Sequence, residues 1–260
     1  MLFFQQKHIK KSPSDRCIVF LHGFLGTSED WEPYLAYFSS KDFHVIAPDL
    51  PGHGSSLSYE LEELIPLIPK KTHLVGYSMG GRIALNLQKC YPNHFSSLTL
   101  ISTNPGLRTA KEKKERIVWE NQIIESLKTE TIENFIQKWY QQSLFSGFVP
   151  PINRLHQNKD GLISAFRKFS IANLPSLWDY LSQSQLPIQM IFGAKDLKYS
   201  KLKQEVKKID TNHRIKTYSV ANCGHSVHLE NPHLIFTLVE NIIGISAEGK
   251  RTSQPSFHQT

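Results

Sequence analysis

The chain has 260 residues, enough for one large globular domain or for a core domain that carries an inserted subdomain. Apolar residues make up 40% of it, and no apolar run approaches the roughly 20 residues that a membrane-spanning helix needs, so we expect a soluble protein that does not insert into membranes. The net charge of +7 admits nucleic-acid binding, but the densest lysine runs alternate with acidic or apolar residues at helical spacing, which favours solvated helix faces and leaves a small anionic partner open.

The cysteines and the N-terminal sequence indicate in which cellular compartment the protein is expected. Cys17, Cys90 and Cys223 are an odd set without a C-x-x-C pair, which fits reduced thiols better than a disulfide framework. The N-terminal apolar stretch ends where polar residues begin at Gln5, well short of the roughly 7 to 15 residues in the apolar part of a secretory signal. We therefore expect a cytoplasmic protein.

Short apolar runs bounded by Gly, Pro or Asp alternate with longer stretches of helical periodicity. This is the pattern of β-α-β units in a parallel sheet, so the predicted class is α/β. Because ligands of open parallel sheets bind beyond the carboxyl ends of the strands, the loops after the strands border the expected site. Strands are predicted at 17–21, 44–47, 73–77, 98–102, 187–192 and 214–219, and a last helix at about 232–243.

The longest interval between predicted strands has helical periodicity and contains Trp119, Trp139 and Trp178. A structureless loop of such length is uncommon in a compact domain. We therefore predict a helical cap at 104–186, inserted between two parts of the core. Those parts are 1–103 and 187–245, and the polar sequence at 246–260 is expected to be a disordered tail.

A G-x-S-x-G sequence, Gly76-Tyr77-Ser78-Met79-Gly80, directly follows a predicted strand and precedes a helical run. In this context it is typical of a nucleophile elbow, where the serine lies in a strained turn and small residues on either side let the backbone fold tightly. A chance match in a glycine-bearing turn is the alternative. The elbow predicts an α/β-hydrolase fold, with a mostly parallel sheet, helices on both faces and the inserted helical cap.

A serine needs a histidine and an acid to act as nucleophile or base, and this fold supplies them in the order Ser, Asp or Glu, His. Asp196 and His225 each follow a predicted strand in that order, so we predict a triad of Ser78, Asp196 and His225. His228 is the competing histidine, but it lacks a preceding glycine. Asp49 precedes the serine in the chain and is interpreted as structural.

Donors for a negatively charged oxygen are expected beside the serine. The backbone N–H of Met79 is the expected first donor, and the loop after the first core strand supplies the second. In that loop Gly23 and Gly26 let the backbone point the N–H of Phe24 into the crevice. These motifs predict activated serine chemistry but not the reaction, since the fold hosts esterases, thioesterases, C–C hydrolases, dehalogenases and lyases.

Two stretches, 76–82 and 223–232, resemble the 2-succinyl-6-hydroxy-2,4-cyclohexadiene-1-carboxylate synthases of menaquinone biosynthesis. The resemblance extends into the predicted cap at 104–107 and 139–142, and covers nearly everything from Val19 to Ile243. It implies a carbon–oxygen lyase that takes a proton from 2-succinyl-5-enolpyruvyl-6-hydroxy-3-cyclohexene-1-carboxylate and expels pyruvate. A departure lies at 56–71, which is shorter than the family's usual helix there.

The substrate that the resemblance implies carries three carboxylates, which arginine binds in bidentate fashion. Arg82 lies four residues past the serine, and Arg116 and Arg167 match family positions that bind carboxylates. Tyr77 and Trp139 match residues that line the family's site. Without the resemblance, Arg116 and Arg167 are better explained as solvated helix residues and an aromatic of a cap helix as core, and an exposed position is the alternative for Arg82.

A serine hydrolase of a small carboxylated ester, thioester or C–C bond is the alternative and would use the same triad. A non-catalytic receptor is disfavoured because the triad and both oxyanion loops are present. The sequence has no G-x-G-x-x-G after a strand, no Walker loop and no H-E-x-x-H. We therefore expect no metal or cofactor, and a small polyanionic substrate as partner. Nothing in the sequence predicts an oligomeric state.

Overall fold

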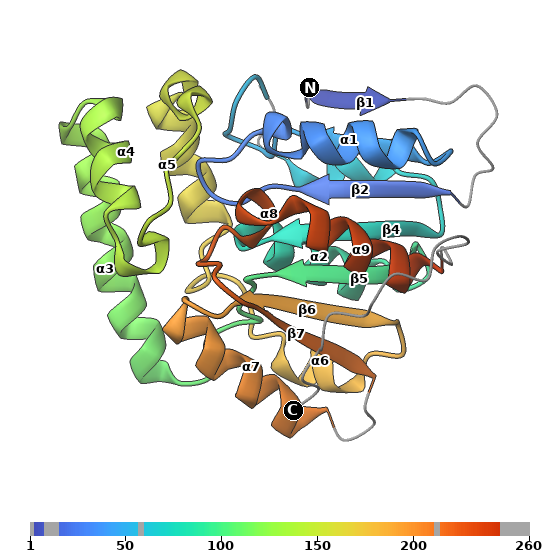
Figure 1. The fold of residues 1–260 in the computed structure, drawn as a ribbon. Helices are drawn as coiled ribbons and strands as arrows, with labels where there is room; N and C mark the ends of the chain where they lie inside the picture. The colour runs from blue at the N-terminus through green and yellow to red at the C-terminus, as the bar shows by residue number, and fades with distance from the viewer. Residues whose placement is uncertain (1–2, 8–15, 57–59, 211–213, 245–260) are drawn as a thin grey trace.

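A computed structural model describes residues 3–7, 16–56, 60–210 and 214–244. Their strands form a seven-stranded sheet in the order β1-β3-β2-β4-β5-β6-β7 (Figure 1). Every neighbouring pair is parallel except β1 and β3, which run antiparallel. The strands are β1 (Phe4–Lys7), β2 (Cys17–Leu21), β3 (His44–Pro48), β4 (Thr72–Tyr77), β5 (Phe95–Ile101), β6 (Ile188–Gly193) and β7 (Ile215–Val220). The predicted α/β class is confirmed.

Helices cover both faces of the sheet because its strands are apolar on both faces. In β2, Val19 packs in a cluster with residues of α2, α6 and α7, whereas Phe20 packs in a second cluster with α1 and α9. Successive strand side chains point to opposite faces, so one short apolar run serves both layers. The covering helices are α1 (Glu32–Ser39), α2 (Met79–Cys90), α6 (Trp178–Gln183), α7 (Leu197–Ile209), α8 (Val227–Glu230) and α9 (Pro232–Ile243).

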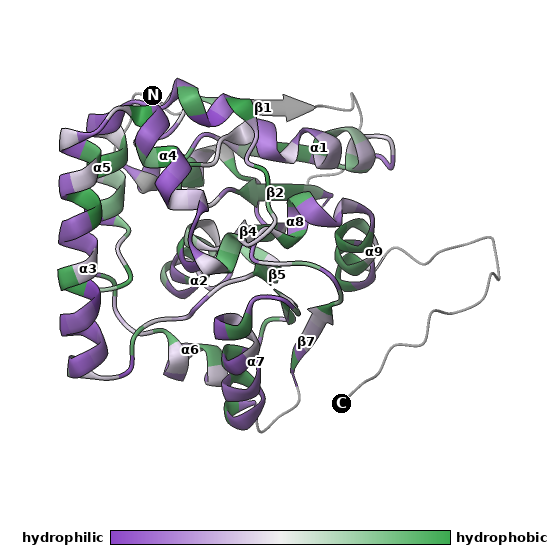
Figure 2. Cartoon of the chain, turned by 60° about the vertical axis from the view of Figure 1, so that its left-hand side comes forward, coloured by the Kyte–Doolittle hydropathy of each residue, from purple (hydrophilic) through white to green (hydrophobic). Residues whose placement is uncertain are grey.

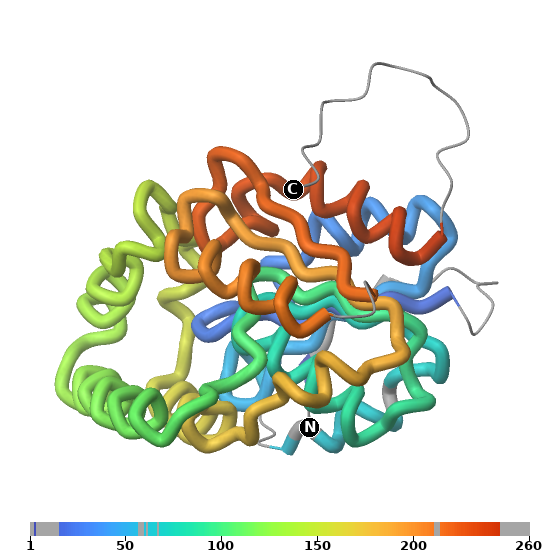
Figure 3. Tube along the Cα trace, turned by 90° about the horizontal axis from the view of Figure 1, so that it is seen from below, coloured from blue at the N-terminus to red at the C-terminus, as the bar shows by residue number. Residues whose placement is uncertain are grey.

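Three further helices lie together at one end of the sheet, toward which the parallel strands point (Figures 1 and 3). They are α3 (Ala110–Thr129), α4 (Ile132–Tyr140) and α5 (Lys159–Lys168). A capping box between Thr109 and Glu112 starts α3, which Figure 2 shows as largely hydrophilic. These helices share an apolar cluster with Leu25, from the loop after β2, and this contact joins them to the core. We call α3 to α5 and the 3-10 turns that follow α4 the cap helices.

Some elements differ from the sequence prediction. The edge strand β1 was not expected, and residues 61–67 form a 3-10 helix with Pro66 inside it. Helix α6 falls inside the predicted cap range, yet its Trp178 and Leu181 pack in the core beneath the sheet. The predicted tail at 246–260 lies outside the described residues. Within the described ranges, no helix is long and apolar enough to cross a membrane.

Candidate active site

Ser78 lies between the end of β4 and the start of α2, with φ 50° and ψ −106°. A positive φ is unfavourable for a residue with a side chain, so this turn stores strain. Two glycines allow it. A Cβ on Gly76 would lie 2.5 Å from the carbonyl oxygen of Gly80, and a Cβ on Gly80 would lie 2.6 Å from the carbonyl carbon of Leu21. The turn therefore has the tight packing that the elbow motif predicts.

The three predicted triad residues lie together. The Ser78 Oγ is 3.2 Å from the His225 Nε2, and the His225 Nδ1 is 2.7 Å from the Asp196 Oδ2. Because a carboxylate only accepts, Nδ1 donates to Asp196, and Nε2 is left to accept the hydroxyl proton of Ser78. Burial lowers the pKa of His225, although Asp196 acts in the opposite direction. The imidazole is therefore neutral near pH 7 and able to act as a base.

Further hydrogen bonds fix the positions of Asp196 and His225. Asp196 begins α7 and also accepts from the backbone N–H of Tyr199. The backbone N–H of His225 donates to the Leu144 carbonyl, and the hydroxyl of Ser102 donates to the His225 carbonyl at 2.7 Å. The positions of the acid and the base are thus set by the first turn of α7, the residue after β5 and the 3-10 turn after α4.

His228 and Asp49, the alternatives for the triad histidine and acid, have structural roles. His228 is buried with its ring 4.1 Å from that of Tyr77 and 4.8 Å from that of Trp31, and burial holds its pKa well below the ordinary value. Asp49 accepts from the backbone N–H groups of Ser28 and Ser55 and so joins two loops. Within the described part of the chain, neither ring nitrogen of His228 has a hydrogen-bond partner, and neither residue lines the cavity into which Ser78 opens.

A cavity of about 510 Å³ lies between the cap helices and the carboxyl ends of the strands, and Ser78 and His225 line it. This is the size of a small-molecule site. Phe24 and Met79, predicted as oxyanion donors, also line the cavity, as do Tyr77 and Trp139. The ring of Phe24 lies 4.9 Å from that of Trp139 and 4.8 Å from that of Phe166, so aromatic groups from core and cap meet in the lining of this cavity.

Two of the three predicted arginines reach this cavity. Arg82 is only 9% exposed, and burial lowers its pKa to about 10. Arg116 donates to Glu120 at 2.7 Å and lies over the ring of Trp119. The prediction for Arg167 is not supported, because this residue is exposed and does not line the cavity. Successive residues of a helix point about 100° apart, so an inward Phe166 turns Arg167 outward.

Sequence reasoning missed a third cation in the lining, Lys198, in the first turn of α7. It stands two residues after Asp196, and this spacing from a predicted triad residue was the signal available in the sequence. Its pKa is lowered by burial and by Arg116 and Arg82, while Asp196 raises it. Among the described residues, no group of three or more His, Cys, Asp or Glu side chains could hold a metal ion.

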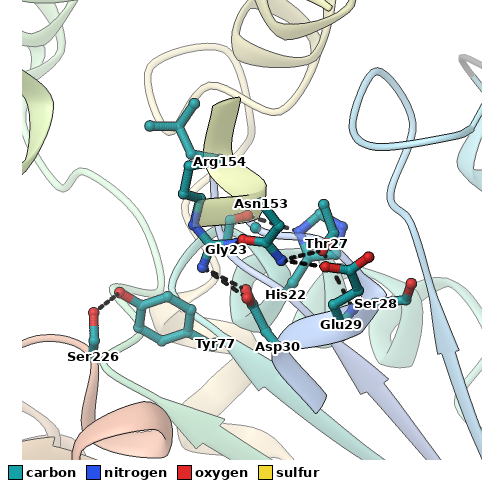
Figure 4. Close-up of polar contacts among 12 residues, drawn as sticks. His22, Gly23, Thr27, Ser28, Glu29, Asp30, Tyr77, Asn153, Arg154 and Ser226 are labelled. Carbon is teal, nitrogen blue, oxygen red and sulfur yellow. Dashed lines mark hydrogen bonds and ion pairs between the residues drawn. The ribbon is translucent and has the colours of Figure 1, made fainter. Parts of the chain in front are cut away.

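A buried contact joins the cap to the loop that carries Phe24 (Figure 4). Arg154, in the 3-10 turn Ile152–His156, pairs with Asp30 at 2.8 Å. Asn153 donates to Glu29 at 2.7 Å. Gln157 donates to the backbone carbonyls of Leu25 and Gly26. We call residues 153–157 and their partners in 25–30 the clasp; it fixes the loop after β2 from the cap side.

The fold and this site define the class of the protein. The model of the alpha/beta hydrolase family matches residues 18–238, and the chain belongs to that family. A Bacillus subtilis protein named putative 2-succinyl-6-hydroxy-2,4-cyclohexadiene-1-carboxylate synthase is 30% identical over 253 residues, which cover 88% of this chain and 91% of that protein. Within the hydrolase family, the chain is thus a member of this group of synthases.

Two further similarities agree with this assignment. The synthase of the same name from Photorhabdus laumondii is 27% identical, with 88% of this chain and 85% of that protein covered. The solved structure of MenH from S. aureus superposes with a TM-score of 0.82 at 26% identity, covering 93% of this chain and 97% of that one. The likeness therefore includes the cap as well as the sheet.

Proposed function

We propose that the protein converts 2-succinyl-5-enolpyruvyl-6-hydroxy-3-cyclohexene-1-carboxylate to 2-succinyl-6-hydroxy-2,4-cyclohexadiene-1-carboxylate and releases pyruvate, acting as a carbon–oxygen lyase of menaquinone biosynthesis. The similarity to the synthases supports this reaction. The observation that carries it in the structure is that a neutral Ser78–His225 pair and the cations Arg82 and Arg116 line one cavity. A base and binding groups for carboxylates are what the reaction needs.

In the proposed mechanism, Ser78 and His225 act together as the base. The proton leaves the ring carbon that bears the succinyl group, and its electron pair forms a double bond to the next ring carbon. The existing ring double bond shifts by one carbon toward the enolpyruvyl group, and the bond from the ring to the enolpyruvyl oxygen breaks. The pyruvate enolate then takes up a proton. Charge that develops on the succinyl ketone oxygen during proton removal would be stabilised by the backbone N–H groups of Phe24 and Met79. Asp196 orients the imidazole and stabilises its charged form.

The substrate would be held between core and cap. Arg82 and Arg116 would each bind a carboxylate, and Tyr77 and Trp139 would form apolar walls against the ring. We also propose a cytoplasmic location, supported by the free thiols of Cys17, Cys90 and Cys223.

The test is to incubate the protein with the enolpyruvyl cyclohexene and follow pyruvate release, with a neutral aryl ester as a second substrate. Ser78→Ala should lower the rate of pyruvate release by about 10²- to 10⁴-fold, whereas Ser182→Ala, in α6 away from the cavity, should not change it. A Ser78→Ala variant with the wild-type rate would refute the role of the triad. Ester hydrolysis by the wild type without pyruvate release would instead indicate a serine hydrolase.

A further inference from the structure

The cavity collects positive charge from three separate elements. Arg82 comes from α2, Arg116 from α3 in the cap, and Lys198 from α7. All three line the cavity with Ser78 and His225. A third cation in the cavity would match the third carboxylate of the proposed substrate, and Arg167 is exposed.

We propose that Lys198 is the third cation of the site and binds a substrate carboxylate. This inference rests on the proposed function and deepens it, because it assigns a binding residue that neither the motifs nor the resemblance indicated. A lysine ammonium suits this position as a compact charge with three donors on a flexible stem. Its flexible side chain can follow a carboxylate during the reaction, whereas the guanidinium of Arg82 is largely buried.

The electrostatic surroundings of Lys198 support the inference. Arg116 and Arg82 both disfavour its charged form, so the three cations are close enough to repel one another. Asp196 favours the charged form, but this carboxylate already accepts from His225 and from the backbone of Tyr199. Like charges that converge on one cavity raise the free energy of the empty site, and an anionic ligand relieves that cost.

Three acids of α3, Glu112, Glu115 and Glu120, also line the cavity, but each already has a partner, and the acid that raises the pKa of Lys198 is Asp196. Glu120 accepts from Arg116 and from the hydroxyl of Ser170. Glu112 accepts from the backbone N–H groups of Arg108 and Thr109, and Glu115 lies 4.0 Å from the Nζ of Lys111. These carboxylates are engaged in α3 and its start, on the cap side, while Lys198 stands on the core side.

The experiment measures binding apart from turnover. Affinity for the enolpyruvyl cyclohexene is determined by calorimetry in the Ser78→Ala background, with and without Lys198→Gln. The loss of one charge-assisted contact should weaken binding by about 10- to 100-fold. Lys198→Arg should restore most of the affinity. Lys201→Gln, an exposed position one turn further along α7, is the matched control and should bind as the parent does.

Steady-state kinetics give the second readout. In the otherwise wild-type enzyme, Lys198→Gln should raise the KM for the substrate and leave kcat within about threefold, since the lost contact exists before and during the reaction. Equal affinity of the Ser78→Ala proteins with and without Lys198→Gln would overturn the inference. A fall in kcat alone would also overturn it, since this would indicate a structural role beside Asp196. If instead the wild type released no pyruvate and Ser78→Ala bound no substrate, the proposed function itself would fail.

Discussion

The buried ion pair of the clasp allows a prediction of stability from the structure. The side chains of Arg154 and Asp30 are only 4% and 1% exposed and lie 2.8 Å apart. Arg154→Met would keep most of the apolar stem but leave the Asp30 carboxylate buried without its cation. Removing one partner of such a pair costs about 3 to 5 kcal/mol. For a chain of this size about 1 kcal/mol corresponds to 2–4 °C, so the Tm should fall by roughly 6 to 20 °C.

The stability lost in Arg154→Met should depend on pH through the ionisation of Asp30. Burial raises the pKa of Asp30, and Arg154 acts against this rise. Without Arg154 the pKa of Asp30 should rise further. A carboxyl whose pKa is raised in the folded state destabilises the fold as pH increases, so the deficit of the variant should shrink when the pH is lowered from 7 to 5.

The assay is urea unfolding at both pH values for the wild type, Arg154→Met, Asp30→Asn and the double variant. The double variant should be more stable than the sum of the two single losses predicts, because neither buried charge is left alone. Lys208→Met, which breaks an exposed pair with Glu205, is the control and should cost less than about 1 kcal/mol. An Arg154→Met protein with a midpoint like that of the control, or additive losses in the double variant, would refute the reasoning.

Two further predictions concern the interior near the elbow. Burial lowers the pKa of both His22 and His53 to about 3, so below pH 6.5 the unfolded chain binds protons that the folded chain does not. The free energy of unfolding should therefore fall as pH drops below about 6.5, by about 1.4 kcal/mol per pH unit for each histidine. Urea midpoints at pH 7.5, 6 and 5 test this, and an unchanged midpoint would contradict it. Gly80→Ala should lose soluble folded protein or activity, because its Cβ would meet the backbone of Leu21. Ala84→Gly in the same helix should cost about 2 kcal/mol, from helix propensity and one buried methyl group. Circular dichroism and pyruvate release distinguish the two variants, and a fully active Gly80→Ala protein would show that the turn can relax.

Sequence patterns sufficed for the parts of the fold set by local chemistry. Runs such as Cys17 to Leu21 are apolar on both faces and end at glycine or a polar residue, so the six parallel strands could be predicted with small errors in their ends. That Ser78, Asp196 and His225 lie together could be predicted because each follows the end of a strand and the three occur in the order that this fold requires. Strand β1 is four residues long, with the polar sequence Phe-Gln-Gln-Lys, and nothing in that sequence indicates that it pairs with β3.

The missed and misplaced cations have one physical cause. Which side of a helix faces the cavity depends on how that helix packs, and the sequence around a single charged residue does not contain that information. A rotation of about 100° separates Phe166, which lines the cavity, from Arg167, which does not. The roles of Lys198 and Arg154 could not be predicted for the same reason, because each depends on which residues of other elements surround the side chain.

The distribution of the lining residues limits how this site could be given a new substrate. Cap helices supply Arg116, Trp119 and Trp139, and in many proteins such an insertion could be exchanged while the triad stays in place. Here Arg82 and Lys198 stand on the same two core helices that begin at the elbow and at Asp196. A protein with an exchanged cap would therefore still favour anions, because these two cations belong to the core and not to the cap. Turning this framework toward neutral molecules requires changes within four residues of the reacting groups themselves.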